Sequence, residues 1–577
     1  MRMKHFYLGL IAMSAASTVS VAAAETRLYY NFTGYTFTQN MVGAQNAADT
    51  QSTVGDVQDL TSFSHMLVTD GKVVAIGNEQ LLQLQPGASP VNLQGRVVLP
   101  GLIDSHGHIY GLGENLRQVD LRGISNRTGT VARVANYADA NLELEWVLGR
   151  GWNQELWPNN DFPTRQDLDS VINDRPVFLV RVDAHAAWVN TQALELAGIT
   201  NDTPDPDGGQ IVRDRDGKAT GILIDTAMDL VRQHIPEPEQ AARMEAVKLA
   251  QQQLLSLGIT QVLDAGVSAA QLDDYRQLNE QDELLIRVNA MISATEPELP
   301  SLLEAGVYES ENQRLRIGNV KVYGDGALGS RGARLIEPYA DAPDHLGLLI
   351  TPAERVRTLF NQIHDAGFQI SYHAIGDYTN QLALDEFARI VEQTDELDTL
   401  ADYRHRIEHA QIVQSSDIPR FRELGIIPSM QPTHATSDMN MAEERIGSER
   451  IQGAYAWRTF IDQGSLIAAG SDFPVELADP FYGIHAAVTR QDRERQPQDG
   501  WYPEQALTLV EALRSFTLDG AYAGYSDTYT GSLEAGKYAD FIVVDRDPFK
   551  TSNKDLWRIK VLATYVAGER VYVQPSP

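Results

Sequence analysis

The sequence predicts an α/β protein whose main body is a (β/α)8 barrel. A small composite β-sandwich domain is expected from both chain ends, and a large insertion is expected after the first barrel strand. Three observations predict this arrangement: strand-like and helical segments alternate through the middle of the chain, β-rich segments lie at both ends, and one connection is far too long.

Short apolar runs alternate with helical segments through the middle of the chain, as in parallel β/α architecture. We count eight such runs: 97–104, 260–264, 286–292, 318–323, 368–373, 405–409, 426–430 and 465–472. Helical stretches at 239–257, 352–366 and 380–393 separate several of them. Eight strands with crossover helices predict a closed barrel over residues 97–525.

The connection between the first and second runs, residues 110–257, is about 150 residues long, far beyond an ordinary βα loop. It contains strand-like runs of its own at 146–150 and 177–182. We therefore expect a folded insertion that overhangs the barrel mouth.

Both ends of the chain are rich in short strands. Residues 66–68 and 73–76 flank an Asp70-Gly71 turn as a hairpin would, and 539–544, 561–565 and 571–573 are strand-like near the other end. We expect residues 25–96 and 526–577 to form one β-domain. The polar stretch 40–59 has no functional interpretation.

The first 24 residues have the three-part pattern of a secretory signal peptide. Arg2 and Lys4 precede an apolar run at 6–13, and small residues end in Ala24. The run is too short for a permanent membrane helix, although an uncleaved anchor is the alternative. Cleavage after Ala24 predicts a periplasmic or secreted protein without stable membrane insertion.

Composition excludes several classes of function. A formal net charge of −31 opposes binding to nucleic acid through its phosphates. The absence of cysteine removes disulfides, thiolate metal sites and cysteine nucleophiles. Any metal ion must therefore be held by His, Asp, Glu or a modified lysine.

Candidate metal ligands stand at the carboxyl ends of the predicted strands, the rim where barrels of this type build their active sites. They are His106, His108, His373, His409 and Asp472. His106 and His108 are two residues apart in an extended segment, so both imidazoles can reach one ion. Each alone is equally compatible with a hydrogen-bonded core histidine or a capping aspartate, but together they favour a metal centre.

Lys321 ends the fourth run among apolar neighbours, where a charged amine is costly unless it is paired or neutralised. Carbamylation by CO2 would convert it into a carboxylate able to bridge two cations. The alternative is a salt bridge to Asp325 or Asp264.

In their order along the chain, the His-x-His motif, Lys321, His373, His409 and Asp472 resemble the binuclear sites of the amidohydrolase superfamily. Segments 258–260, 321–331, 431–434 and 187–190 resemble its YtcJ-like, amidohydrolase 3 branch, which includes N-substituted formamide deformylase. Leu263 departs from that pattern, because many relatives have histidine there.

The resemblance implies a site with two divalent ions, with zinc the expected metal. His106 and His108 would hold one ion and His373 and His409 the other. Carbamylated Lys321 and a hydroxide would bridge them, and Asp472 would complete the first site and shuttle the proton to the leaving amine. Asp104 and Glu408 are the nearest carboxylates that could orient the histidines, although strand alternation points Glu408 away.

The branch motifs also imply substrate contacts on segments over the barrel mouth: Trp152, Asp183, His185, Arg331 and His434. For the tryptophan, ordinary packing within the insertion is the alternative. The expected activity is hydrolysis of an amide-type C–N bond in an N-acyl or N-formyl amine.

Three other functions stay open at this point. The same centre would serve an ester or lactone hydrolase, and one metal alone would serve a deaminase. A non-catalytic binding protein is the third, but a degenerate site would be expected to have lost ligands. The expected partner is a small-molecule substrate, and a homodimer is compatible with the sequence.

Overall fold

The structure is a computed structural model that describes residues 25–38, 60–84, 86–181, 186–206, 209–394 and 402–575. The predicted signal peptide and the polar stretch 40–59 lie outside these residues. Within the described ranges, no helix is both long and apolar enough to cross a membrane.

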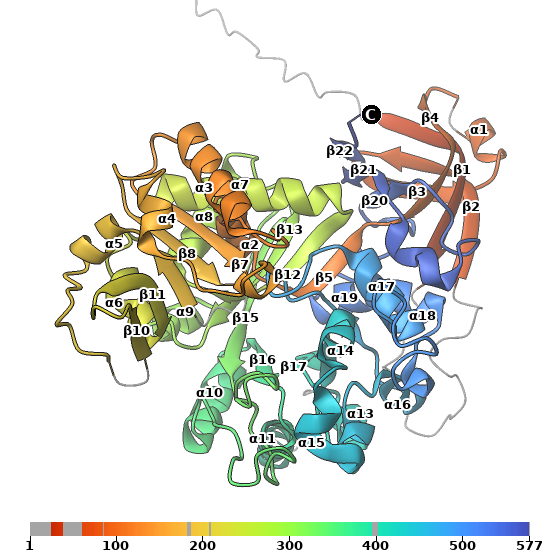
Figure 1. Cartoon of the computed structure of the whole chain (residues 1–577). Coiled ribbons are helices and arrows are strands. Elements are labelled where there is room, and N and C mark those ends of the chain that lie inside the picture. Colours follow the sequence, from red (N-terminus) through yellow and green to blue (C-terminus); the bar gives the residue numbers. More distant parts are fainter. Residues whose placement is uncertain are drawn as a thin grey trace, which may run out of the picture.

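Eight parallel strands form the central barrel (Figure 1). They are β5 (Leu102–Gly107), β12 (Ile259–Val267), β13 (Arg287–Ser293), β15 (Leu315–Tyr323), β16 (Gln369–Ala374), β17 (Arg406–His409), β18 (Ile427–Met430) and β19 (Ala468–Ala469). Hydrogen-bonded neighbours follow chain order from β5 to β19. The amide of Asp472 donates to the carbonyl of His106 at 2.7 Å, which joins the two ends of the ring. The predicted barrel is confirmed, and each predicted run overlaps one of its strands.

Helices cover the outside of the barrel and cross between its strands. They are α2 (Ile109–Leu116), α7 (Gln240–Ser256), α8 (Ala269–Glu280), α9 (Leu299–Ala305), α10 (Ala353–Asp365), α11 (Asp377–Thr394), α13 (Ile418–Leu424), α14 (Pro432–Asp438), α15 (Ala442–Arg450), α16 (Trp457–Asp462), α17 (Pro480–Thr489), α18 (Leu509–Ser515) and α19 (Leu518–Ala523). Their sequences explain their placement. In α10, Val356, Leu359, Phe360 and Ile363 are buried at helical spacing, so one apolar stripe faces the barrel.

Strands from both chain ends form one seven-stranded sheet, in the order β22-β21-β20-β4-β1-β2-β3. They are β1 (Thr26–Phe37), β2 (Leu60–Thr69), β3 (Lys72–Gly77), β4 (Ser89–Pro100), β20 (Phe541–Val544), β21 (Val561–Val566) and β22 (Glu569–Val573), with the short helix α1 (Leu81–Leu84) after β3. The expected hairpin turn has positive φ at both Asp70 (49°) and Gly71 (76°), as a type I′ turn requires. Both chain ends therefore contribute strands to one sheet, as expected for the composite domain.

The first predicted run contains the boundary between this sheet and the barrel. β4 ends at Pro100 and β5 begins at Leu102, with Gly101 between them. A Cβ at Gly101 would lie 2.3 Å from Oγ1 of Thr260, so only glycine lets the chain pass so close to β12.

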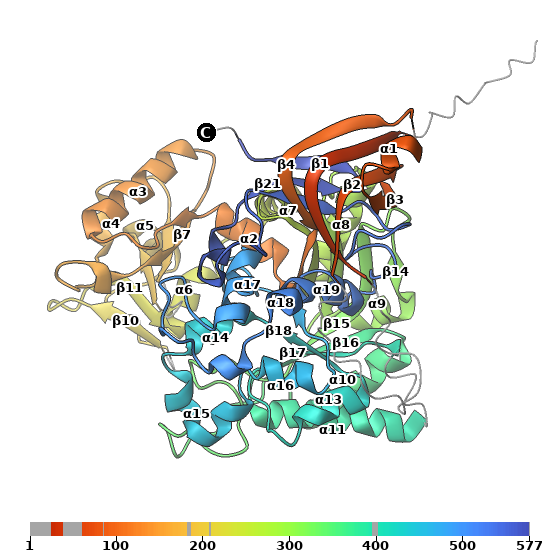
Figure 2. The same ribbon diagram turned by 90° about the vertical axis from the view of Figure 1, so that its right-hand side faces the viewer.

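A second, six-stranded sheet lies within the long connection after β5, in the order β10-β11-β9-β8-β7-β6. Its strands are β6 (Val119–Asp120), β7 (Val147–Trp152), β8 (Val177–Arg181), β9 (Ala186–Val189), β10 (Gly209–Arg213) and β11 (Ala219–Asp225). The helices α3 (Arg127–Ala140), α4 (Arg165–Asp169), α5 (Thr191–Leu196) and α6 (Asp229–Arg232) belong to the same segment. In Figures 1 and 2 this insertion stands beside the barrel, apart from the seven-stranded sheet.

A buried ion pair ties the barrel to the seven-stranded sheet. At the start of β13, Arg287 donates to both carboxylate oxygens of Asp540 at 2.7 and 3.2 Å, and both side chains are less than 5% exposed. The guanidinium also lies 4.2 Å from the ring centroid of Tyr538. Asp540 accepts a further bond from the amide of Ala567, so it links three segments.

We expect Asp540→Asn to destabilise the protein by about 3–5 kcal/mol, because it leaves the Arg287 charge buried without a carboxylate partner. Thermal unfolding followed by circular dichroism measures the shift in midpoint. The control is Asp229→Asn, which removes an exposed pair with Arg232 and should cost less than about 1 kcal/mol. Equal shifts for the two variants would contradict the structural role of the Arg287–Asp540 pair.

Candidate active site

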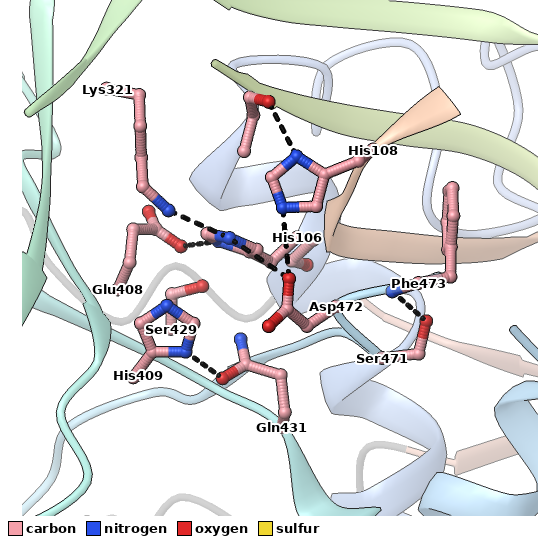
Figure 3. A network of polar contacts seen from close by, with 12 residues as sticks. His106, His108, Lys321, Glu408, His409, Ser429, Gln431, Ser471, Asp472 and Phe473 are labelled. Atoms are coloured by element: carbon pink, nitrogen blue, oxygen red, sulfur yellow. Dashed lines mark hydrogen bonds and ion pairs between the residues drawn. The ribbon is translucent and has the colours of Figure 1, made fainter. Parts of the chain in front are cut away.

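The residues predicted as metal ligands come together at the carboxyl ends of the barrel strands. His106 lies near the end of β5, Lys321 in β15, His373 in β16 and His409 at the end of β17. Asp472 follows β19 and His108 follows β5. Figure 3 shows the imidazoles of His106 and His108 directed toward Asp472, with Lys321 and Glu408 beside His106.

The backbone at the end of β17 brings two neighbouring side chains into the site. His409 and Ala410 both have positive φ, 72° and 42°, which non-glycine residues rarely adopt. Regular alternation is therefore broken after Glu408. The expectation that Glu408 points away is wrong: its Oε2 lies 2.5 Å from Nδ1 of His106, and both side chains are fully buried.

In three of the histidines, Nδ1 lies within hydrogen-bond distance of an acceptor oxygen of the protein. Besides the bond of His106 to Glu408, Nδ1 of His108 lies 2.8 Å from the carbonyl of Ala265, and Nδ1 of His409 lies 2.8 Å from Oε1 of Gln431. All three partners are acceptors, so each Nδ1 carries the proton and each Nε2 presents a lone pair. This is the arrangement by which metal-binding histidines are held in one tautomer.

Asp472 stands between two pairs of histidines. Its Oδ1 lies 3.1 Å from Nε2 of His108 and 3.7 Å from Nε2 of His106, and its Oδ2 lies 3.7 Å from Nε2 of His434. Donor atoms that share one tetrahedral zinc ion are about 3.4 Å apart. The geometry thus gives two groups of potential ligands, His106–His108–Asp472 and His409–His434–Asp472, each with its ligand atoms within 4.8 Å of one another.

His373 contributes a further buried nitrogen. Its ring centroid lies 4.4 Å from that of His409, and its Nε2 forms no hydrogen bond to any described residue. Nε2 of His434 is likewise buried without a hydrogen-bond partner among those residues. Leaving such atoms unsatisfied is costly. The residues present therefore fit metal ions, which would satisfy these nitrogens.

Lys321 is buried in contact with the first histidine, and its Nζ lies 2.9 Å from Nε2 of His106. The alternative salt bridges are not formed within the described residues. Asp264 accepts from the hydroxyl of Tyr275, and Asp325 accepts from the amides of Ile375 and Gly376. Burial lowers the pKa of Lys321 to about 8, although Glu408 and Asp472 oppose the shift.

The surroundings favour neutral His106 and His373 and an ionised Glu408, whereas the pKa of His108 is raised because Asp472 outweighs the effect of burial. Burial lowers the pKa of His106 to about 4, with Lys321 adding to the effect, and burial also holds the pKa of His373 well below its ordinary value. Burial alone would raise the pKa of Glu408, but Arg406 and His106 hold it well below the usual range. Neutral imidazoles beside ionised carboxylates are ready to bind a divalent cation.

Unlike the candidate metal ligands, the predicted substrate-contact residues do not all lie together at the site. His434, in α14, belongs to the site, and its ring stacks on His409 at 5.9 Å. Arg331 lies in the loop after β15 and pairs with Asp341 at 2.7 Å. Asp183 and His185 lie outside the described residues.

Trp152 belongs to the core of the insertion. Its ring is fully buried, lies 6.1 Å from that of Trp188 and 6.4 Å from that of Trp157, and donates from Nε1 to the carbonyl of Leu179. The structure therefore favours packing over substrate contact for this residue.

Two residues that support the site were not assigned from the sequence. Gln431 orients His409. It lies in the motif 431–434, from which the sequence suggested only His434. Arg406 pairs with Glu408 through Nε at 2.7 Å and is fully buried in the barrel. An arginine two residues before a glutamate on one strand is the only sequence signal for that pair.

A parallel barrel whose strand ends gather four histidines, a lysine and an aspartate defines the class of metal-dependent hydrolases. The chain belongs to the amidohydrolase family, whose model matches residues 90–572. The resemblance seen in the sequence is confirmed, and the protein is an enzyme of the class that hydrolyses C–N bonds.

Named relatives cover nearly the whole chain. The protein named amidohydrolase YtcJ in Bacillus subtilis is 32% identical over 88% of this chain and 95% of its own. N-substituted formamide deformylase of Arthrobacter pascens is 28% identical over 87% and 94%. Among solved structures, a metal-dependent hydrolase of uncharacterised function from Pyrococcus furiosus is 30% identical, with a TM-score of 0.73 over 91% of this chain and 100% of that one.

We expect Glu408→Gln to weaken metal binding about 10–100-fold, because the amide no longer provides the charged acceptor that fixes the tautomer of His106. Metal loss during titration with a chelator measures the change. Glu386→Gln is the matched control, since Glu386 on α11 is a buried glutamate paired with Arg357 of α10 and Arg389 of α11. Equal metal retention by both variants would contradict the role assigned to Glu408.

Proposed function

We propose that this protein is an exported amidohydrolase that uses two divalent metal ions, zinc by preference, to hydrolyse the C–N bond of an N-acyl or N-formyl amine. The observation that carries the proposal is the position of Asp472 between two groups of imidazole nitrogens, with Lys321 beside His106. Similarity to an N-substituted formamide deformylase over 87% of the chain supports the substrate class.

His106, His108 and Asp472 would hold the first ion. His409 and His373 would hold the second, and Lys321, carbamylated by CO2, would lie between the two. Bound divalent ions would supply a hydroxide near neutral pH and polarise the scissile carbonyl.

The protein's own residues would transfer the proton and exclude water. Asp472 accepts the proton of the attacking water and passes it to the nitrogen of the leaving amine, so the amine departs neutral. His108 and His434 flank the carboxylate, with their Nε2 atoms 3.1 and 3.7 Å from its oxygens. His106 is fully buried and Asp472 is only 7% exposed, so few waters compete with the substrate there.

The position of Lys321 also weighs against the rival functions. A mononuclear deaminase has no use for a lysine in contact with His106, and a binding protein has no reason to keep every ligand. An ester or lactone hydrolase would use the same centre, and a substrate panel separates it from an amidase.

We expect about two divalent ions per chain in the purified protein, and about one or none after Lys321→Ala, together with loss of activity. Inductively coupled plasma mass spectrometry measures the metal, and a panel of N-formyl amines, N-acyl amines, esters and lactones measures the activity. The control is Lys537→Ala, which removes another buried lysine, bonded to Ser532 far from the site. An unchanged metal content in Lys321→Ala would contradict the two-metal mechanism.

Export makes a separate prediction. The mature chain should begin at Glu25, because small residues up to Ala24 fit the cleavage site of a signal peptide. Intact mass of the protein recovered from the periplasm or medium tests this. Recovery of the full-length chain in the cytoplasm would contradict export.

A further inference from the structure

An apolar groove of about 870 Å³ lies between α9 and α10 on the outside of the barrel. From α10 it is lined by Arg355, Leu359 and Gln362, which share one helix face, and from α9 by Leu299 and Leu303. Figure 1 shows the two helices on the same side of the barrel, with β15 between them. A cavity of this size holds a drug-sized molecule.

The groove reaches the catalytic rim. Its inner end is formed by Ala294 and Thr295, directly after β13, and by Tyr323, the last residue of β15. Tyr323 also faces the metal centre, because Nζ of Lys321 lies 5.8 Å from the centroid of its ring. One aromatic ring therefore separates the groove from Lys321.

The position of that ring is fixed by its surroundings. The hydroxyl of Ser293 lies 3.4 Å from the hydroxyl of Tyr323. Gly266, with φ of 78°, makes room for the same hydroxyl, since a Cβ there would lie 2.4 Å from it. The ring therefore has a defined position at the junction of the groove and the metal centre.

The groove is open and apolar beside the loop after β15, where the amide of Ile350 donates to the carbonyl of Gly324 at 2.8 Å. Ile350, which lines it, is 59% exposed, and Leu348, two residues earlier, is 69% exposed. The acidic group nearest the inner end, Glu296, accepts the amide of Ala269 at 3.0 Å, so its charge is already bound to a helix N-terminus. Arg355 and Asp365 on α10 also line the groove, but most of its lining is apolar, and an uncharged chain or ring suits that part best.

We propose that the groove binds the apolar part of the substrate. Tyr323 then sets how the attached amide enters the metal centre. The preferred substrates are amides with a long alkyl or an aromatic group on the acyl or amine side. This inference rests on the proposed function, whose reacting amide lies beside Lys321 and Asp472.

The test is a series of N-acyl derivatives of one amine, from formyl and acetyl to hexanoyl and decanoyl. In the metal-loaded wild-type enzyme, kcat/KM should rise with chain length. Leu303→Trp and Ile350→Trp, which fill the groove from its wall and its mouth, should lower the ratio of decanoyl to acetyl kcat/KM about tenfold or more. Leu196→Trp, at a 52% exposed position on α5, should leave the ratio unchanged.

A binding measurement separates this proposal from the proposed function. Titration with N-phenyl-1-naphthylamine, an uncharged apolar fluorescent probe, should show about tenfold weaker binding in Leu303→Trp than in Leu196→Trp. Hydrolysis without chain-length dependence, or equal probe binding in the two variants, would overturn the groove proposal alone. If no amide of the series is hydrolysed, the proposed function is overturned, and the probe titration still decides whether the groove binds apolar ligands.

Discussion

The active site depends on the joint that closes the barrel between its first and last strands. Asp104 in β5 accepts from the amide and the hydroxyl of Ser471, the latter at 2.6 Å, and from the amide of His106. The amide of Asp472 in turn donates to the carbonyl of His106. A Cβ at Gly470 would lie 2.6 Å from the nitrogen of His106, so the approach requires glycine. Because of this joint, candidate ligands separated by more than 350 positions come together.

Around that joint, most of the polar chemistry serves to orient imidazoles. Glu408, Gln431 and the carbonyl of Ala265 each hold one Nδ1, which leaves each Nε2 as a lone-pair donor facing the centre. Arg406 keeps Glu408 ionised within a fully buried environment. The cost of burying these charges is offset only when all partners are present, so the site is expected to be rigid and intolerant of single deletions.

Sequence reasoning predicted the barrel strands and the cluster of candidate ligands because both follow local rules. Apolar runs mark parallel strands, and polar residues at their ends mark the catalytic rim. It did not reach features that depend on backbone dihedrals or distant contacts. Arg406 and Glu408 face the barrel interior by regular alternation, and positive φ at His409 brings the next side chain inward as well, which no alternation pattern predicts.

Trp152 could not be assigned to packing without the positions of Trp157 and Trp188. The Arg287–Asp540 pair joins positions 253 residues apart.

The central claim is that the site holds two metal ions, with carbamylated Lys321 between them and Asp472 as a ligand of the first. A crystal structure of the metal-loaded protein, with anomalous scattering at the absorption edge of the metal, tests it most directly. The account predicts two anomalous peaks, one at His106 and His108 and one at His409, with electron density for a carboxylate extending from Nζ of Lys321. A single peak with an unmodified Lys321 side chain would contradict it.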